Sequence, residues 1–398
     1  MSISTFYTLF WIIYFPTCIA YNDLPGFSSV DEVMTVILMA FTLTKKGVRS
    51  TNNKPWREYF MFLGILAFYI VYSLVFGVNV RGAVWLDMVQ QIRPYSVIYC
   101  TWILAPRFSR TQRRMMLFTM IITLASWIVY HPSTIQSQEA EFPVLGQLAI
   151  CCGMAWYLLT KESPRNRWIA LALVCCGLLA PKMKFIGEVV CFVGMMFFVK
   201  KRLNFRSPRT IVILSVLVAL CVFFTWSKFE GYYVSGWNNE ALARPMSYKT
   251  SLKLLVDYFP FGPGMGSFAT NAAWKYYSPI YPMYNLDHVW GLTPHDGFFI
   301  CDAFYPTLAQ FGIVGVILFF IFWKRRLREI VRIPDMRCYR VAMIAFFCLA
   351  IESTADSSYL SGKGMGYFML LALCLNYKKL LAPLGPPCRG KRKIQQND

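Results

Sequence analysis

The sequence predicts an all-α polytopic membrane protein with about twelve transmembrane helices and one large loop. Hydrophobic residues make up 57% of the 398 residues and charged residues only 15%, whereas a soluble domain carries roughly 25% charged residues. Apolar runs recur along the chain, and most approach the ~20 residues that an α-helix needs to cross a ~30 Å hydrocarbon core. Basic residues are concentrated in alternate connections between these runs, as expected of a chain that crosses a membrane repeatedly.

The apolar runs also divide the chain. The first run has no basic region before it and no small-residue cleavage site after it, so it is expected to be a retained helix and not a signal peptide. We expect nine spans in residues 1–226, a large loop at 227–302, three spans in 303–378 and a basic tail at 379–398. The twelve predicted spans are residues 4–20, 30–44, 59–77, 84–104, 115–131, 144–160, 168–181, 185–199, 210–227, 303–323, 341–356 and 364–378.

The basic residues predict which side of the membrane each connection occupies. Most of the 40 lysine and arginine residues fall on one side of the predicted bundle. Because basic loops stay in the cytoplasm, both termini are expected there, and the 227–302 loop is expected in the periplasm of a bacterial inner membrane. The formal charge of +20 therefore indicates topology and contact with anionic lipid headgroups, not nucleic-acid binding. The basic segments are residues 45–57, 107–114, 161–167, 200–209, 324–340 and 378–398.

Cysteine and glycine patterns give no sign of a metal or a cofactor. Most of the 13 cysteines lie in apolar runs or on the basic side, where a thiol usually serves as a small packing residue. The sequence has no zinc-ligand spacing, no GxGxxG motif and no P-loop. We therefore expect no bound metal and no cofactor.

The 227–302 loop is the strongest functional candidate, because loops this long are usually functional. It contains Arg244, His295 and the run PFGPGMGSF from Pro260. A short helix is expected at 248–256, ending before Pro260. Its aromatic residues either anchor the loop at headgroup level or form stacking surfaces for sugars. The candidates for sugar contact are Tyr276, Tyr277, Tyr281 and Trp290.

Charged residues within or beside the predicted spans are a second signal, because each costs at least ~2.5 kcal/mol at mid-depth unless it is paired or faces water. Arg93 either pairs with Glu188 or Glu352 or helps to bind an anionic ligand. Lys182 and Lys184, in an outer turn, either extend to headgroup level or converge with Arg244 on a lipid diphosphate. Asp356 is a further acidic residue at the end of a predicted span.

His295 is the candidate general base, because an imidazole with a pKa near 6.5 can accept a proton at neutral pH. Asp296 follows it directly and would raise the basicity of a nearby imidazole. The alternative is a histidine that caps or packs at the start of the next helix.

The order of these features resembles the O-antigen ligase and O-antigen polymerase superfamily of bacterial surface-polysaccharide enzymes. The ordered features are a basic outer turn, a loop arginine, the run DYFPFGPGMGSF at 257–268, a histidine before the next helix, and QFGIVGVILFF at 310–320. The resemblance covers the topology of the whole chain, but its specific motifs span only about 180–320. The turn residue is lysine where that family usually has arginine, and the aromatic passage YYSPIYPMY favours the polymerase branch.

The resemblance implies an architecture like that of GT-C glycosyltransferases and a metal-independent, inverting glycosyl transfer. The donor would be a glycan on undecaprenyl pyrophosphate and the acceptor a hydroxyl of another lipid-linked sugar, with a chain-length regulator as a further partner. By position, Arg244 and Lys182 or Lys184 would bind the diphosphate, and His295 would activate the acceptor. The residues themselves add Arg93 as a further candidate for the diphosphate and Asp296 as an aid to His295. The alternatives are an O-antigen ligase, a polysaccharide flippase or transporter, and a scaffold for polysaccharide export.

Overall fold

A computed structural model describes residues 1–23, 29–45, 53–130, 142–180, 182–199, 201–203, 207–224, 226 and 230–381. All regular structure in these ranges is helical, and no strand occurs in them. Three of the described helices are long and apolar enough to cross a membrane: Lys54–Phe76, Tyr305–Val331 and Met336–Ala355. The all-helical fold class and the membrane character of the chain therefore agree with the sequence prediction.

Each of the first six predicted apolar runs forms a helix. Helix α5 contains Pro94, which packs within the bundle without ending the helix. Helices α1, α5, α8 and α18 enclose much of the main hydrophobic core. The six helices are α1 (Ile3–Asp23), α2 (Val30–Thr44), α4 (Asn53–Phe76), α5 (Arg81–Leu104), α6 (Arg110–Tyr130) and α8 (Phe142–Leu159).

The next helices are shorter than their predicted spans. Helix α9 (Pro164–Cys175) ends in the 3₁₀ turn η2 (Cys176–Leu179), and α10 (Met183–Val193) ends in the π-helical turn η3 (Gly194–Phe198). At 1.5 Å per residue, an 11-residue α-helix is only ~16 Å long, about half the thickness of a hydrocarbon core. The predicted runs 168–181 and 185–199 are therefore largely helical but interrupted. Helix α11 covers Pro208–Phe224.

Residues 230–302 form a folded unit with its own small core. Helix α13 (Ala243–Asp257) includes the predicted helix at 248–256 and ends before Pro260, which confirms that prediction. The remaining elements are the π-helical turn η4 (Glu230–Val234), the 3₁₀ turn η5 (Gly236–Asn238) and the short helices α14 (Asn271–Lys275) and α15 (Ile280–Met283). The core of the unit includes Leu254, Phe268, Ile280, Tyr281, Leu286, Leu292 and Ile300.

The tenth predicted span differs from expectation at both ends. It begins with the 3₁₀ helix η6 (Tyr305–Phe311), which has Pro306 in its first turn, and continues as α16 (Gly312–Val331). Apolar residues stop at position 323, but the following residues are good helix formers, so the helix extends well past the predicted limit. The last helices are α17 (Met336–Ala355), α18 (Met365–Leu375) and α19 (Tyr377–Leu381). The predicted tail lies outside the described residues from position 382.

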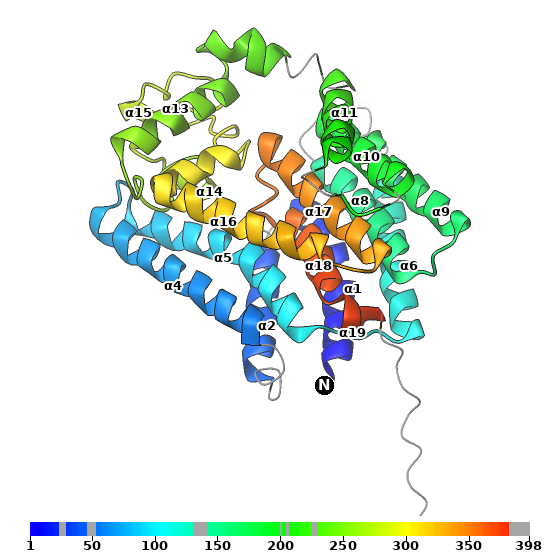
Figure 1. Cartoon of the computed structure of the whole chain (residues 1–398). Helices are drawn as coiled ribbons and strands as arrows, with labels where there is room; N and C mark the ends of the chain where they lie inside the picture. The colour runs from blue at the N-terminus through cyan, green and yellow to red at the C-terminus, as the bar shows by residue number, and fades with distance from the viewer. Residues whose placement is uncertain are drawn as a thin grey trace, which may run out of the picture.

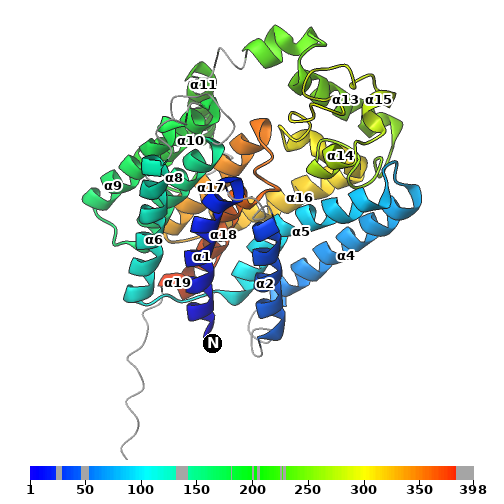
Figure 2. The same cartoon turned by 180° about the vertical axis from the view of Figure 1, so that it is seen from behind.

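The two ends of the helical bundle differ in what they carry. Figures 1 and 2 show the N-terminus and α19 at one end, and the unit that contains α13, α14 and α15 at the other. Predicted basic connections meet at the first end: Arg113 donates to the Leu380 carbonyl, and Arg337 donates to the Thr160 carbonyl. The candidate site described next lies towards the opposite end.

Candidate functional site

Lys184 joins two acidic residues from the end of α17. Its Nζ lies 2.5 Å from Glu352 Oε2 and 2.5 Å from Asp356 Oδ2, and its side chain is 6% exposed. Glu352 lies in the last turns of α17, and Asp356 follows the helix in an extended conformation. The interaction therefore joins the start of α10 to the end of α17. Lys182 is half-buried, lines a separate apolar pocket and forms no ion pair with the described acidic residues.

A second ion pair lies within the 230–302 unit and joins the start of α13 to its last residue. Arg244, in the first turn of α13, places Nη2 2.5 Å and Nε 2.8 Å from Asp302 Oδ2. The Tyr232 ring lies 4.6 Å from the guanidinium carbon, within the range of a cation–π contact. Sequence reasoning treated Asp302 only as a loop boundary. The signal that could have identified Asp302 as a partner for Arg244 is its position, because it is a carboxylate close to a predicted helix start in a loop that is otherwise basic and aromatic.

The two ion pairs are electrostatically linked. Burial raises the pKa of Asp302 to about 6, with Arg244 and Lys184 opposing the rise and Asp356 adding to it. Asp302 therefore lies within electrostatic range of the Lys184 pair. We term Arg244, Asp302, Lys184, Glu352 and Asp356 the charged cluster. Arg244 and Lys184 are each already paired with a carboxylate, so an anionic ligand must displace a carboxylate in order to bind them.

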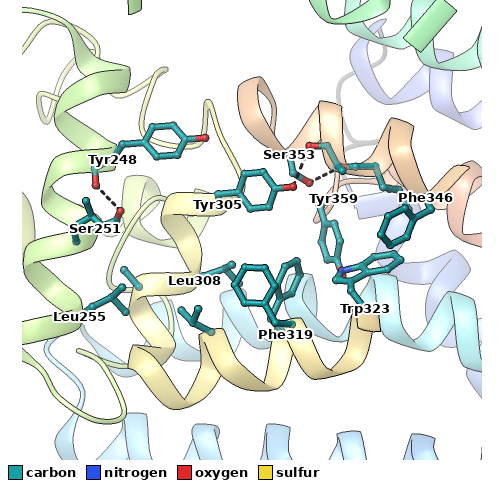
Figure 3. A pocket seen from close by; sticks show the side chains of 16 residues that line it. Tyr248, Ser251, Leu255, Tyr305, Leu308, Phe319, Trp323, Phe346, Ser353 and Tyr359 are labelled. Atoms are coloured by element: carbon teal, nitrogen blue, oxygen red, sulfur yellow. Dashed lines mark hydrogen bonds between the residues drawn. The ribbon is translucent and has the colours of Figure 1, made fainter. Parts of the chain in front are cut away.

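An apolar groove of about 480 Å³ adjoins the charged cluster. Figure 3 shows Tyr248 and Leu255 of α13 on one side, and Phe319 and Trp323 of α16 below. The two features share helices: α13 carries Arg244 one turn before Tyr248, and α17 carries Ser353 in the groove wall beside Glu352. This arrangement places an ionic site next to an elongated apolar one, which suits a ligand with a charged head and an apolar tail.

Arg93 belongs to a different set of contacts. Its Nη1 lies 2.6 Å from Asp31 Oδ2 and its Nη2 2.5 Å from Glu32 Oε1. It also donates to the Leu360 carbonyl, while the Gly362 N–H donates to Asp31. The open interpretation of a pair with Glu188 or Glu352 is therefore wrong, because the acidic partners come from α2. Arg93 therefore anchors the connection between α17 and α18 through the Leu360 carbonyl, and its Nε has no hydrogen-bond partner among the described residues.

The connection between α17 and α18 links Arg93 to the charged cluster. Asp356 begins it, and Ser358 donates to Glu352. Glu188 is buried beside this connection and accepts a hydrogen bond from the Tyr367 hydroxyl at 2.8 Å. Glu188 therefore lies behind the cluster, within the helical core.

His295 and Asp296 lie on an exposed bend of the 230–302 unit. The Asp296 N–H donates to Thr293 Oγ1 at 2.9 Å, and neither side chain forms an ion pair with any described residue. The alternative in which His295 caps or packs at the start of the next helix is wrong, because regular helix begins only at Tyr305. Residues 298–302 form turns instead. The catalytic role of this pair stays a prediction.

The four aromatic candidates fall into two groups. Trp290 is 64% exposed and Tyr276 is also exposed, so both can meet a sugar. Tyr281 is only 1% exposed, and its hydroxyl accepts a hydrogen bond from the Ala269 N–H. Tyr277 stacks on Tyr281 and donates to the Leu292 carbonyl. Tyr281 therefore belongs to the core of the unit and presents no surface to a sugar.

The glycine-rich run at 260–268 anchors the unit to the bundle. The Gly266 N–H donates to Asp87 Oδ2 at 3.0 Å and to Gln310 Oε1 at 2.9 Å. Gly262 has a positive φ of 80° and abuts Gly312, where a side chain would collide with backbone. Because these groups bond to the protein itself, the run positions the unit and offers no phosphate cradle.

Neither a metal centre nor a known relative identifies the site. Across the described ranges, no group of three or more His, Cys, Asp or Glu side chains could hold a metal ion. A scan against models of protein families finds no match to this chain, and a search of curated proteins finds none either.

Proposed function

We propose that this chain is a membrane glycosyltransferase that polymerises oligosaccharide repeat units carried on undecaprenyl pyrophosphate. In this proposal the chain crosses a bacterial inner membrane about twelve times, with both termini in the cytoplasm and the 227–302 loop in the periplasm. The observation that carries it is the position of Arg244 and Lys184 beside the apolar groove. The meeting of basic connections at the opposite end of the bundle supports the orientation.

The donor lipid matches both parts of the site. Its diphosphate would replace Asp302 on Arg244 and contact Lys184, because guanidinium and ammonium groups bind phosphate oxygens strongly. Its polyprenyl tail would occupy the groove between α13, α16 and α17. These cations would take up the negative charge that develops on the leaving diphosphate.

The acceptor is expected on the exposed face of the 230–302 unit. His295, with Asp296 beside it, would remove the proton from the acceptor hydroxyl. The hydroxyl oxygen would then bond to the anomeric carbon with inversion as the bond from that carbon to the diphosphate oxygen breaks. Trp290 and Tyr276 would hold the sugars through stacking.

A gel of surface polysaccharide from a strain that lacks this gene tests the proposal. We expect lipid A-core molecules that carry a single repeat unit, because ligation to lipid A-core would continue without polymerisation. Lipid A-core without any repeat unit, together with long polymer retained on its lipid carrier, would instead identify this protein as an O-antigen ligase. An unchanged ladder would contradict both assignments.

A flippase or transporter is the second candidate, favoured by the connection between α17 and α18. This connection, which contains the 3₁₀ turn η7 (Gly362–Gly364), is held between two sets of ion pairs, Arg93 with Asp31 and Lys184 with Asp356. Charged residues buried within the membrane often mark substrate or ion pathways in transporters. Transfer of a labelled lipid-linked repeat unit across vesicles by the purified protein would favour this candidate. Elongation of that unit without transfer would favour the polymerase.

A further inference from the structure

A second apolar groove, of about 220 Å³, lies on the other side of α16, between α4, α5 and α16. Helices α4 and α16 form two of the segments able to cross a membrane, and only 22% and 33% of their apolar windows are buried within the protein. Apolar side chains of both helices line the groove, including Met61, Ile65 and Leu318. The groove therefore faces the hydrocarbon of the bilayer.

One end of this groove is charged. Arg325, Arg326 and Glu58 line it, and Arg325 is exposed. Arg326 pairs with Glu58, and the Trp102 ring lies 4.6 Å from its guanidinium carbon. This is the end of the bundle at which Lys54 and Arg57 begin α4. Two carboxylates, Glu58 and Glu329, lie among these four cations, so the local charge is net positive.

Arg326 has donors without acceptors, although its side chain is only 1% exposed. Its Nε and Nη1 form no hydrogen bond within the described part of the chain. Nη1 lies 3.0 Å from Glu329 Oε2, but the pair lacks hydrogen-bond alignment. A buried donor left unsatisfied costs about 1–3 kcal/mol, and more when the group is charged. An acceptor from outside the protein would remove this penalty.

The length of the groove matches one leaflet. Glu58 and Tyr69, the first and last residues of α4 that line it, are eleven positions apart, or ~16 Å along a helix. This is about half of a ~30 Å hydrocarbon core. An acyl chain in the groove would therefore place its headgroup at the basic end of the bundle.

We propose that this groove binds an anionic phospholipid, with an acyl chain against α4 and α16 and its phosphate on Arg325 and on the Nε N–H of Arg326, which has no hydrogen-bond partner among the described residues. The proposal is independent of the glycosyltransferase assignment. It requires only that the chain lies in a membrane. The site favours an anionic over a zwitterionic lipid because the added negative charge meets Arg325.

Native mass spectrometry of the detergent-purified full chain, titrated with phosphatidylglycerol or phosphatidylethanolamine, tests the proposal. We expect one saturable phosphatidylglycerol site that Arg325→Gln weakens about fivefold, from ~1 kcal/mol per basic residue near a lipid surface. Arg328→Gln is the matched control, because Arg328 is an exposed arginine on the same helix outside the groove. It should change affinity less than twofold.

A second variant tests the groove independently of charge. Leu318→Trp should fill the groove and weaken binding of both lipids, while size-exclusion elution stays normal. Equal weakening by Arg325→Gln and Arg328→Gln would mean general surface charge and would overturn the proposal. So would equal affinity for the two lipids, or unchanged binding to the Leu318→Trp protein.

Discussion

Arg244 and Asp302 form an ion pair that joins the start of α13 to the last residue of the 230–302 unit, with Nη2 and Nε of the arginine 2.5 Å and 2.8 Å from one carboxylate oxygen. Both side chains are largely buried. In the absence of a ligand, the arginine proposed to bind the diphosphate is therefore already occupied by a carboxylate. A diphosphate must displace Asp302, so exchange between the two anions becomes part of donor binding.

Arg244→Ala should abolish polymer formation in cells, because the diphosphate loses its forked donor. Arg244→Lys should restore only a small part of it, since an ammonium lacks that geometry. The measurement is the polysaccharide ladder on a gel, normalised to protein in the membrane fraction. Lys253→Ala, at an exposed lysine of the same helix, is the matched control and should give a normal ladder. A normal ladder from Arg244→Ala would contradict the site.

Asp302 should make stability depend on pH. Its pKa is raised by burial from 3.8 to about 6, so the folded protein holds this proton more tightly than the unfolded chain. The resulting stabilisation is complete below about pH 3.8 and is lost as the pH rises through about 6, by on the order of 2–3 kcal/mol. Thermal unfolding in detergent from pH 4 to 7 should show this fall for the wild type, and Asp302→Asn should lack it. Parallel profiles for the two proteins would rule the effect out.

Lys184 and Lys182 should differ sharply when replaced. Lys184→Met leaves Glu352 and Asp356 buried without a cation, which costs about 3–5 kcal/mol. Lys182→Met should change the free energy of unfolding by no more than about 0.5 kcal/mol. Melting temperature and membrane yield provide the measurement. Adding Asp356→Asn to Lys184→Met should recover part of the loss, because it removes one unpaired charge. Equal effects of the two lysine variants would show that the Lys184 pair contributes little.

Two aromatic candidates should separate function from stability. Trp290→Ala should shorten or weaken the polymer ladder while leaving the melting temperature almost unchanged, because Trp290 is exposed. Tyr281→Ala should instead destabilise the protein by about 3–5 kcal/mol, as for other buried aromatic truncations. Comparing ladder and melting temperature for both variants checks this division. A stable Tyr281→Ala protein with altered polymer would reverse it.

Local sequence pattern predicted helices better than it predicted contacts. The helix before Pro260 and the first six apolar runs follow from residue periodicity and from strong local signals. The prediction placed the end of the tenth helix too early, because the apolar run stops at position 323. The end of an apolar run marks where a chain leaves the hydrocarbon, whereas the helix itself can continue beyond that point. The acidic partners of Arg93 could not be chosen from sequence, because Asp31 and Glu32 reach it only through tertiary packing.

The candidate site shows the same division. Lys184 and Arg244 were identified because buried or outer-loop cations are unusual in such an apolar chain. The sequence did not indicate Asp302 as the partner of Arg244. It also could not show that Tyr281 is buried and Trp290 exposed, because exposure within a folded loop depends on residues far apart in sequence. The position of His295 on an exposed bend was equally inaccessible to sequence pattern.

Elongation of a purified undecaprenyl-pyrophosphate-linked repeat unit by the purified protein in vesicles, with a chelator present, tests the central claim most directly. The account predicts a ladder of longer lipid-linked products from the wild type, and none from Arg244→Ala or His295→Ala. Absence of products from the wild type, activity that returns only with a divalent cation, or full activity of both variants would contradict it.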